Sequence, residues 1–290
     1  MLKPFSLSAP DDYARWRDQK LANFPTASED LLVEVRDLAH VSKAEGEAIA
    51  DRIGRAGMAI YKTSPNADKN DVRAFGQHFG LKSLDKNPYA DEDAITSLHN
   101  SHQAGRKLYI PYTNKAINWH TDGYYNESSR TIRAMVLHCL RPAGVSGGEN
   151  QLFDPEIAYI LMRDHDPEMI KALMDDNAMT IPGNGTDDHV DRQDSAGPVF
   201  SVDPKTETLH MRYTARKRHV IWADDEVTGR AKDFLLDILG GPYTFNYQLS
   251  AGEGLICNNV LHTRSAFQDG ETDDQKRLIL RARYWERLVL

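Results

Sequence analysis

The sequence has few cysteines, no long apolar run and no excess of positive charge, and each shortage excludes a class of protein. Cys139 and Cys257 are the only two cysteines among 290 residues, so a disulfide framework is excluded and a reducing compartment is favoured. No apolar run approaches the roughly 18 residues of a membrane helix, and residues 1–6 lack the apolar core of a secretion signal. We therefore expect a soluble, cytoplasmic protein.

The charge balance argues against nucleic acid as a partner. Lys and Arg number 35 against 43 Asp and Glu, a net charge of −8, whereas phosphate backbones require a concentrated positive surface. One basic run, residues 212–219, is interpreted as a solvated strand or loop, with a local anion site as the alternative. We expect a small-molecule substrate. The apolar residues 288–290 pack either on the core or on a second subunit, so a homo-oligomer stays open.

Apolar periodicity predicts a few helices among many short strands. We predict helices over residues 11–21, 42–55, 68–79 and 224–239, and one or two helices over residues 155–174. We predict strands over residues 57–61, 131–140, 150–153, 198–202, 209–213, 219–222, 243–248, 255–258 and 278–284. Residues 81–118 have no clear pattern, and a loop this long is typical of an active-site lid. The mixture favours a mainly β double-sheet barrel with helices packed outside.

Two histidines and one aspartate form a pattern typical of an iron site. His120 and Asp122 are two residues apart, so in an extended strand they point to the same face. His262 follows a second strand-like run, residues 254–261. Two imidazoles and one carboxylate on one face of a metal leave the other face open, which is the ligand set of non-heme Fe(II) oxygenases. A lone His-x-Asp is weak evidence and fits an ordinary loop hydrogen bond equally well.

Three further features stand in a matching order. They are the segment Gly147-Gly148-Glu149-Asn150, the run from His262 to Phe267, and two arginines, Arg277 and Arg281, in an apolar strand. With these, the chain resembles the taurine dioxygenase-like (TauD/TfdA) family of Fe(II)/2-oxoglutarate-dependent dioxygenases from about Ser42 to residue 290.

The resemblance implies a double-stranded β-helix (jelly roll, cupin-like) over residues 42–290, with residues 1–41 as an N-terminal extension packed on it. It implies that His120, Asp122 and His262 bind Fe(II). It assigns Arg277 to the far carboxylate of 2-oxoglutarate, with Arg281 as a second arginine near the cosubstrate or substrate. Dioxygen completes the cofactor set.

One position departs from the family pattern. Asn150 stands where the family has a threonine that donates a hydrogen bond to 2-oxoglutarate. The asparagine amide can still donate such a bond, so we predict that Asn150 contacts the cosubstrate.

The expected activity is hydroxylation of an unactivated C–H bond of a small, charged metabolite, with release of succinate and CO2. The two distal arginines favour a carboxylate or sulfonate, and the aromatic residues also allow a quaternary ammonium. The candidate substrate contacts are Asn118, Tyr124, Arg212, His99 and Tyr112, with His102 and Arg106 in the same long loop. Two alternatives stay open: an iron oxygenase that does not use 2-oxoglutarate, and a non-catalytic sensor that binds metal or 2-oxoglutarate.

Overall fold

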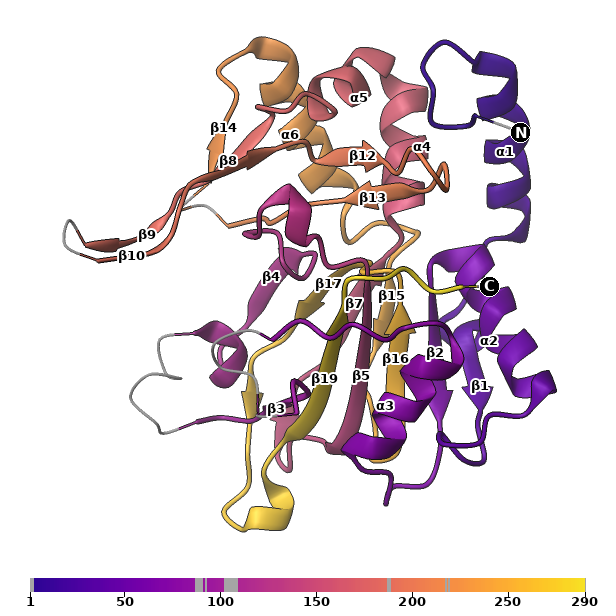
Figure 1. The fold of residues 1–290 in the computed structure, drawn as a ribbon, viewed down its shortest axis with the longest axis vertical. Coiled ribbons are helices and arrows are strands. Elements are labelled where there is room, and N and C mark those ends of the chain that lie inside the picture. Colours follow the sequence, from indigo (N-terminus) through magenta and orange to yellow (C-terminus); the bar gives the residue numbers. More distant parts are fainter. Residues whose placement is uncertain are drawn as a thin grey trace. The chain divides into compact units, whose positions relative to one another are not determined.

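The computed structural model describes residues 3–86, 91, 93–101, 109–186, 189–216, 218 and 220–289. The chain divides into two compact units (Figure 1). Unit 1 comprises residues 1–24, 119–131 and 153–244, and unit 2 comprises residues 25–118, 132–152 and 245–290. The predicted N-terminal extension, residues 1–41, stays a prediction, because this division cuts the chain differently, after Phe24.

Unit 2 is built on a six-stranded sheet with the order β1-β2-β16-β5-β19-β3. Only β1 and β2 pair in parallel among these neighbours. Alternate residues of a strand face opposite sides of a sheet. In β19, Leu280 and Ala282 therefore face an apolar core, while Arg281 and Arg283 face the other side. The strands are β1 (Leu32–Glu34), β2 (Met58–Lys62), β3 (Thr96–Leu98), β5 (Ala134–Arg141), β16 (Glu253–Cys257) and β19 (Leu278–Tyr284).

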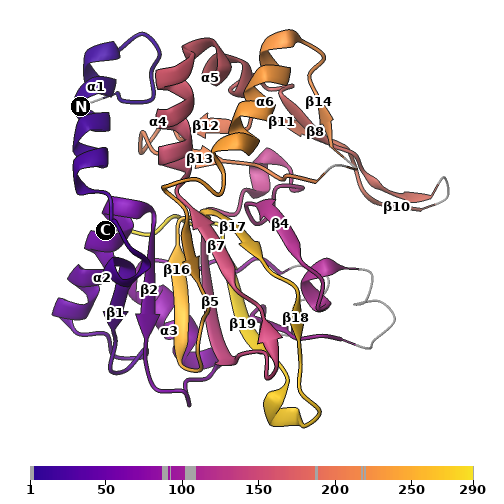
Figure 2. The same ribbon diagram turned by 180° about the vertical axis from the view of Figure 1, so that it is seen from behind.

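Helices α2 (Lys43–Ala56) and α3 (Lys69–His78) cover the apolar face of this sheet, as Figures 1 and 2 show from opposite sides. The predicted capping box begins α2: the Ser42 hydroxyl accepts from the Glu45 N–H at 3.3 Å, and the Glu45 carboxylate accepts from the Ser42 N–H at 2.7 Å. Ile49 and Phe75, one from each helix, are fully buried in the core between helices and sheet.

A four-stranded sheet, in the order β15-β7-β17-β4, and the short pair β18-β6 complete the β structure around the site. The strands are β4 (Ile117–His120), β6 (Ser146–Gly147), β7 (Asn150–Phe153), β15 (Phe245–Tyr247), β17 (Leu261–Arg264) and β18 (Phe267–Gln268). The fold is the expected double-stranded β-helix, mainly β with peripheral helices.

The run 254–261, which we interpreted as one strand, is divided between two sheets. β16 ends at Cys257, and β17 begins at Leu261. Between them Asn259 has a left-handed φ of 52°, a conformation that asparagine tolerates better than most residues. Its side-chain amide donates to the Ile132 carbonyl at 2.7 Å, which holds the turn in place. The break sends the chain from one sheet into the other just before His262.

The described residues of unit 1 form four α-helices, one short 3-10 helix and several short strands. The α-helices are α1 (Pro10–Asn23), α4 (Pro155–His165), α5 (Pro167–Leu173) and α6 (Glu226–Ile238), and the 3-10 helix is Ser128–Arg130. The strands are β8 (Met179–Ile181), β9 (Asn184–Thr186), β10 (His189–Arg192), β11 (Ser195–Gly197), β12 (Phe200–Val202), β13 (Leu209–Met211) and β14 (Ile221–Trp222). A buried ion cluster ties α1 to the start of α4: Lys20 Nζ lies 2.7 Å from both Asp154 Oδ2 and Glu156 Oε2.

The predicted helices are confirmed with bounds shifted by a few residues, and residues 155–174 form two helices. Asp166 ends α4 and caps α5, whose first residue is Pro167. The sequence reasoning missed β1, β3, β6, β8–β11 and β18, all of them four residues or shorter. The irregular segment 81–118 contains β3, the short 3-10 helix Ile110–Tyr112 and the start of β4.

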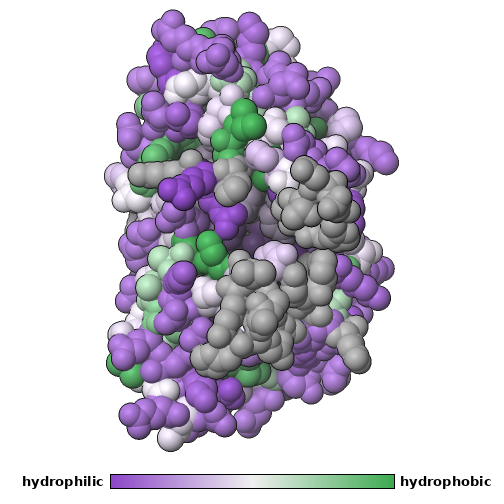
Figure 3. All heavy atoms as spheres, turned by 90° about the vertical axis from the view of Figure 1, so that its left-hand side faces the viewer, coloured by the Kyte–Doolittle hydropathy of each residue, from purple (hydrophilic) through white to green (hydrophobic). Residues whose placement is uncertain are grey.

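Few large apolar side chains are exposed in the part of the chain that the structure describes. They are Leu7, Tyr109, Val145, Ile221, Leu236 and Val289. On the face drawn in Figure 3 hydrophilic residues predominate, and apolar ones form small separate patches. Leu288 packs into the core of unit 2, whereas Val289 is exposed. None of the described helices combines the length and apolar character that crossing a membrane requires.

Candidate active site

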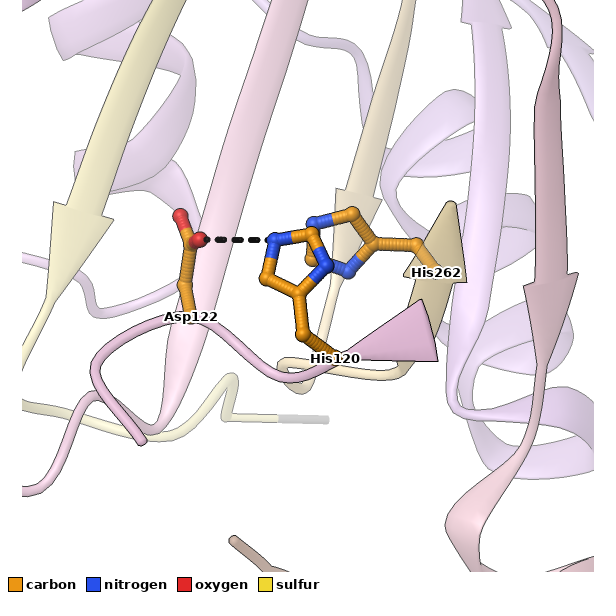
Figure 4. A group of neighbouring side chains, drawn as sticks. All are labelled: His120, Asp122 and His262. Atoms are coloured by element: carbon orange, nitrogen blue, oxygen red, sulfur yellow. Dashed lines mark ion pairs between the residues drawn. The ribbon is translucent and has the colours of Figure 1, made fainter. Parts of the chain in front are cut away.

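The structure brings the three predicted metal ligands together. One donor atom each from His120, Asp122 and His262 lies within 4.8 Å of the others, and the side chains point toward one another (Figure 4). His120 Nε2 is 3.6 Å from Asp122 Oδ1, too long for a hydrogen bond. Two donors that each lie roughly 2.1 Å from one ion are roughly 3–4 Å apart. The spacing therefore suits two ligands of one metal ion.

Local structure positions the first two ligands differently from our prediction of one continuous strand. His120 is the last residue of β4, and Asp122 lies just beyond it, in a turn completed by Gly123 with φ 72°. Thr121 anchors this turn: its N–H donates to the Tyr213 carbonyl at 3.0 Å, and its hydroxyl accepts from the Tyr213 N–H at 3.1 Å. The Asp122 carboxylate therefore lies near the His120 side chain, although Asp122 itself is not part of a strand.

The third ligand is held in the form that a metal requires. His262 is 7% exposed, and its Nδ1 lies 2.9 Å from the Val260 carbonyl oxygen. A carbonyl oxygen accepts only, so Nδ1 carries the hydrogen and the Nε2 lone pair is left for a metal. Two imidazoles and one carboxylate, with no cysteine, fit Fe(II) with open positions better than a closed structural zinc site.

Arg277 is a buried cation in unit 2. It is 6% exposed, and burial lowers its pKa to about 10. Its guanidinium lies 5.1 Å over the ring of Phe267 and, within the described residues, forms no ion pair. A buried charge is costly unless an opposite charge meets it. The position therefore suits the far carboxylate of a dicarboxylic cosubstrate, which guanidinium can bind through two hydrogen bonds.

The glycine pair of the Gly-Gly-acidic segment leaves room beside this arginine. Gly147 and Gly148 have φ of 77° and 85°, in the left-handed region that favours glycine. A Cβ at Gly147 would lie 1.9 Å from the Ala266 carbonyl oxygen, and one at Gly148 would lie 3.3 Å from Arg277 Nε. The motif is thus explained by the close approach of two backbone segments and of the Arg277 side chain.

Asn150 lines the same small cavity as Arg277. Its side-chain amide donates to the Thr263 carbonyl oxygen at 2.8 Å, between β7 and β17. One amide hydrogen is used in this way, and the second remains for another acceptor. The predicted contact of Asn150 with 2-oxoglutarate stays a prediction, now with a shared cavity to support it.

Arg264 is a residue near the site to which sequence reasoning gave no role. It is 5% exposed and donates to the carbonyl oxygens of Pro111, Thr113 and Lys115 at 3.2, 2.7 and 2.5 Å. Burial and the charges of Arg277 and Arg281 lower its pKa to about 9. It holds the segment that leads into β4, and its place two residues after His262 was the available signal.

Arg281 lies on β19, opposite Leu137 of β5 and Thr96 of β3, and is 8% exposed. It faces the side of the sheet away from the helices, as does Arg283, whose guanidinium pairs with the Asp85 carboxylate. Arg277, not Arg281, lies in the cavity with Asn150, which supports Arg277 as the main anchor.

The substrate candidates are placed in different surroundings. The Tyr124 ring lies 6.3 Å from the His120 ring, nearly perpendicular to it. Tyr112 is 2% exposed, His99 is half-buried, and Asn118 is exposed. His102 and Arg106 lie outside the described residues.

Arg212 is directed into the protein. Its guanidinium donates to the carbonyl oxygens of Met179, Gly197 and Ser195 at 2.9, 3.3 and 2.6 Å, and burial lowers its pKa to about 10. These bonds join β8 and β11, so we remove Arg212 from the substrate contacts that we propose.

Comparison with known proteins decides the family. A family model described as "Taurine catabolism dioxygenase TauD, TfdA family" matches residues 18–283. The chain belongs to this family. The name of the family describes dioxygenases, and the His120, Asp122 and His262 constellation is chemically suited to hold an iron ion.

One curated relative and several solved structures are similar to this TauD-family chain. A uridine-5'-phosphate dioxygenase from an Amycolatopsis species is 32% identical over 181 residues, which are 58% of this chain and 60% of the relative. The match thus spans less than two thirds of that relative. PvcB from Pseudomonas aeruginosa superposes with a TM-score of 0.59 at 17% identity, covering 87% of this chain and 84% of PvcB. The non-heme iron oxygenase OrfP superposes with a TM-score of 0.61 at 14% identity, covering 85% and 81%.

Proposed function

We propose that the protein hydroxylates an unactivated C–H bond of a small anionic metabolite and converts 2-oxoglutarate to succinate and CO2. The observation that carries this proposal is the buried group of His120, Asp122 and His262, with donor atoms within 4.8 Å of one another. Bound iron with 2-oxoglutarate supplies the oxidising chemistry. The residues of the chain supply binding, orientation and charge.

Each of these residues has a defined task. His262 offers Nε2 because its Nδ1 hydrogen is directed to the Val260 carbonyl oxygen. Asp122 offers a negative charge, which offsets part of the charge of a divalent ion. Arg277 orients 2-oxoglutarate through its far carboxylate, and the Phe267 ring lies 5.1 Å from the guanidinium carbon. A cosubstrate held at both ends cannot rotate, so its ketoacid end reaches the metal in one orientation.

The presence of Asp122 favours hydroxylation over halogenation. In related halogenases a small residue replaces the carboxylate, so that chloride can take its place. Asp122 occupies that position here. We expect only hydroxylated product or its breakdown products in buffer containing chloride, and a chlorinated product in mass spectrometry would contradict this assignment.

The class of substrate follows from charge. An arginine binds a carboxylate or a sulfonate through paired hydrogen bonds, and Arg281, a buried arginine on the side of the sheet away from the helices, is our candidate contact for such a group. A phosphate joins these candidates because one relative is, by name, a dioxygenase of uridine-5'-phosphate. A quaternary ammonium remains the alternative, with Tyr124 and Tyr125, 5.3 Å apart, as its aromatic contacts.

An anaerobic titration with Fe(II) and 2-oxoglutarate tests the proposed site directly. Chelation of iron by a ketoacid gives a weak visible absorption band. We expect the band to require both additions, to persist in an Arg230→Met control on α6, and to vanish in Asp122→Ala. Arg230 is half-exposed and lies on a helix of unit 1, so it tests only the general effect of a substitution.

Succinate release then tests turnover. With the band present, a panel of carboxylates, sulfonates and phosphates should contain a compound that raises succinate formation well above the rate without substrate. A protein that binds Fe(II) but shows no band with 2-oxoglutarate would contradict the proposed chelate. A band without stimulated succinate release by any compound in such a panel would instead point to a sensor.

A further inference from the structure

The basic run of residues 212–219 contains an arginine that structural contacts leave available. Arg212 donates to three carbonyl oxygens, as described above. Arg216, four residues further on, is exposed and, within the described residues, makes neither an ion pair nor a hydrogen bond. An exposed arginine is usually only solvated, so its position must decide whether it has a function.

Backbone pairing places the segment that leads to Arg216 beside the first metal ligand. The Thr121 N–H donates to the Tyr213 carbonyl at 3.0 Å, and the Ala215 N–H donates to the Trp119 carbonyl at 2.8 Å. Thr214 thereby forms an antiparallel bridge with His120. Directly opposed residues of antiparallel strands project to the same face, so Thr214 lies on the face from which His120 reaches the metal.

Arg216 continues along that face. It is two residues beyond Thr214 in the same segment, and residues two apart in extended backbone share a side. Tyr124 lies in the same neighbourhood, because its ring is 6.3 Å from the ring of His120, the residue that Thr214 opposes.

A second arginine close to this region is already used. Arg192 donates to the Pro182 carbonyl at 2.6 Å and to the Tyr125 carbonyl at 3.3 Å, and it lies 5.9 Å from the Tyr125 ring. It therefore fixes the backbone that follows Asp122. Arg216 differs from Arg192 and Arg212 because its donors are not taken up by described residues.

We propose that Arg216 binds the anionic group of the substrate, with the Thr214 and Tyr124 hydroxyls as neutral hydrogen-bond partners, and that this group is a phosphate monoester. Guanidinium binds two oxygens of a phosphate at once, and the dianion gains more from it than a carboxylate does. A phosphate monoester has three exposed oxygens, so it can accept from the guanidinium and from both hydroxyls. The inference rests on the proposed function and names the substrate class of the same site.

The test measures binding separately from chemistry. The protein is loaded anaerobically with Fe(II) and 2-oxoglutarate and titrated calorimetrically with uridine 5'-phosphate and with uridine, a pair that differs only in the phosphate. The variants are Arg216→Gln, which removes the charge, Arg216→Lys, which keeps it, and Arg218→Gln as the matched control. Arg218 is exposed in the same basic run and lies two residues further from the bridge between Thr214 and His120.

We expect the wild type to bind the phosphate roughly 10- to 100-fold more tightly than the nucleoside. Arg216→Gln should remove that preference, Arg216→Lys should keep part of it, and Arg218→Gln should keep all of it. No preference in the wild type, a full preference in Arg216→Gln, or an equal loss in Arg218→Gln would each overturn the assignment. The visible band of the iron chelate is recorded on the same samples. It depends on His120, Asp122 and His262 and not on Arg216, so a normal band without phosphate preference would refute the role of Arg216 alone, whereas a missing band would refute the proposed function.

Discussion

Replacing Arg277 with methionine should abolish the response to 2-oxoglutarate without destabilising the free protein. The wild-type guanidinium is 6% exposed and has no ion-pair partner among the described residues, and burial lowers its pKa from 12.5 to about 10. Such a fall corresponds to about 3 kcal/mol of unfavourable free energy for the charged form. Methionine keeps the apolar stem against Phe267 and removes the charge, so unfolding of the free variant should cost as much energy as in the wild type, or more.

The same substitution should weaken the binding of 2-oxoglutarate, although it does not destabilise the free protein. Two charge-assisted hydrogen bonds to a carboxylate contribute roughly 1.5–3 kcal/mol each, so their loss should weaken 2-oxoglutarate binding by at least about 100-fold. At a 2-oxoglutarate concentration 100 times its Kd, ligand binding stabilises the wild type by about 2.7 kcal/mol. That stabilisation corresponds to a rise of several degrees in Tm for a chain of this size.

Anaerobic thermal unfolding with and without 2-oxoglutarate, in the presence of Fe(II), measures both effects. We expect the Tm of the wild type and of the Arg230→Met control to rise by several degrees on addition of 2-oxoglutarate. Without 2-oxoglutarate, Arg277→Met should have the same Tm as the wild type or a higher one, and adding the cosubstrate should hardly change it. A wild-type-sized gain in Arg277→Met would refute the anchor. A large fall in the Tm of the free variant would refute the inference that the buried charge of Arg277 destabilises the free wild-type protein.

Three further predictions concern the scaffold. Burial lowers the His138 pKa from 6.5 to about 4. Because the unfolded chain is protonated first, this histidine does not reduce the stability of the fold above pH 6.5, and about 3 kcal/mol of stability is lost as pH falls from 6.5 to 4. His138→Leu should remove that pH dependence, measured as the free energy of urea unfolding at both pH values. Gly147→Ala should destabilise the fold by about 1–3 kcal/mol, since its Cβ would lie 1.9 Å from a backbone oxygen, and an unchanged urea midpoint would contradict that close approach. Lys20→Met should cost about 3–5 kcal/mol because Asp154 and Glu156 lose the buried ammonium that lies 2.7 Å from each; a Tm within 1–2 °C of the wild type would show that the cluster is not needed.

The parts of the fold that depend on nearby residues could be predicted from the sequence. The capping box of Ser42 and Glu45, the helical periodicity of residues 68–79 and the long apolar strand 131–140 each act within a few residues, and each appears where expected. Strands of two to four residues were missed, because so short a segment carries too little pattern to distinguish it from a turn.

The chemistry of the site could also be predicted, because it depends on which side chains are present. Two histidines, one aspartate and a distal arginine, in family order, indicate iron and a dicarboxylic cosubstrate before any coordinates are considered. The structure brings the donor atoms of His120, Asp122 and His262 within 4.8 Å of one another.

The tertiary structure decided which of several similar side chains is available to a ligand. Arg212, Arg216 and Arg264 are all arginines in or near strand-like segments, and nothing in the sequence separates them. Arg212 and Arg264 each donate to three carbonyl oxygens of distant segments, while Arg277 and Arg216 do not. The sequence shows where each arginine lies along the chain, but strand pairing between distant segments decides which carbonyl groups an arginine can reach. Only the folded chain therefore distinguishes an arginine that supports the scaffold from one that can bind a ligand.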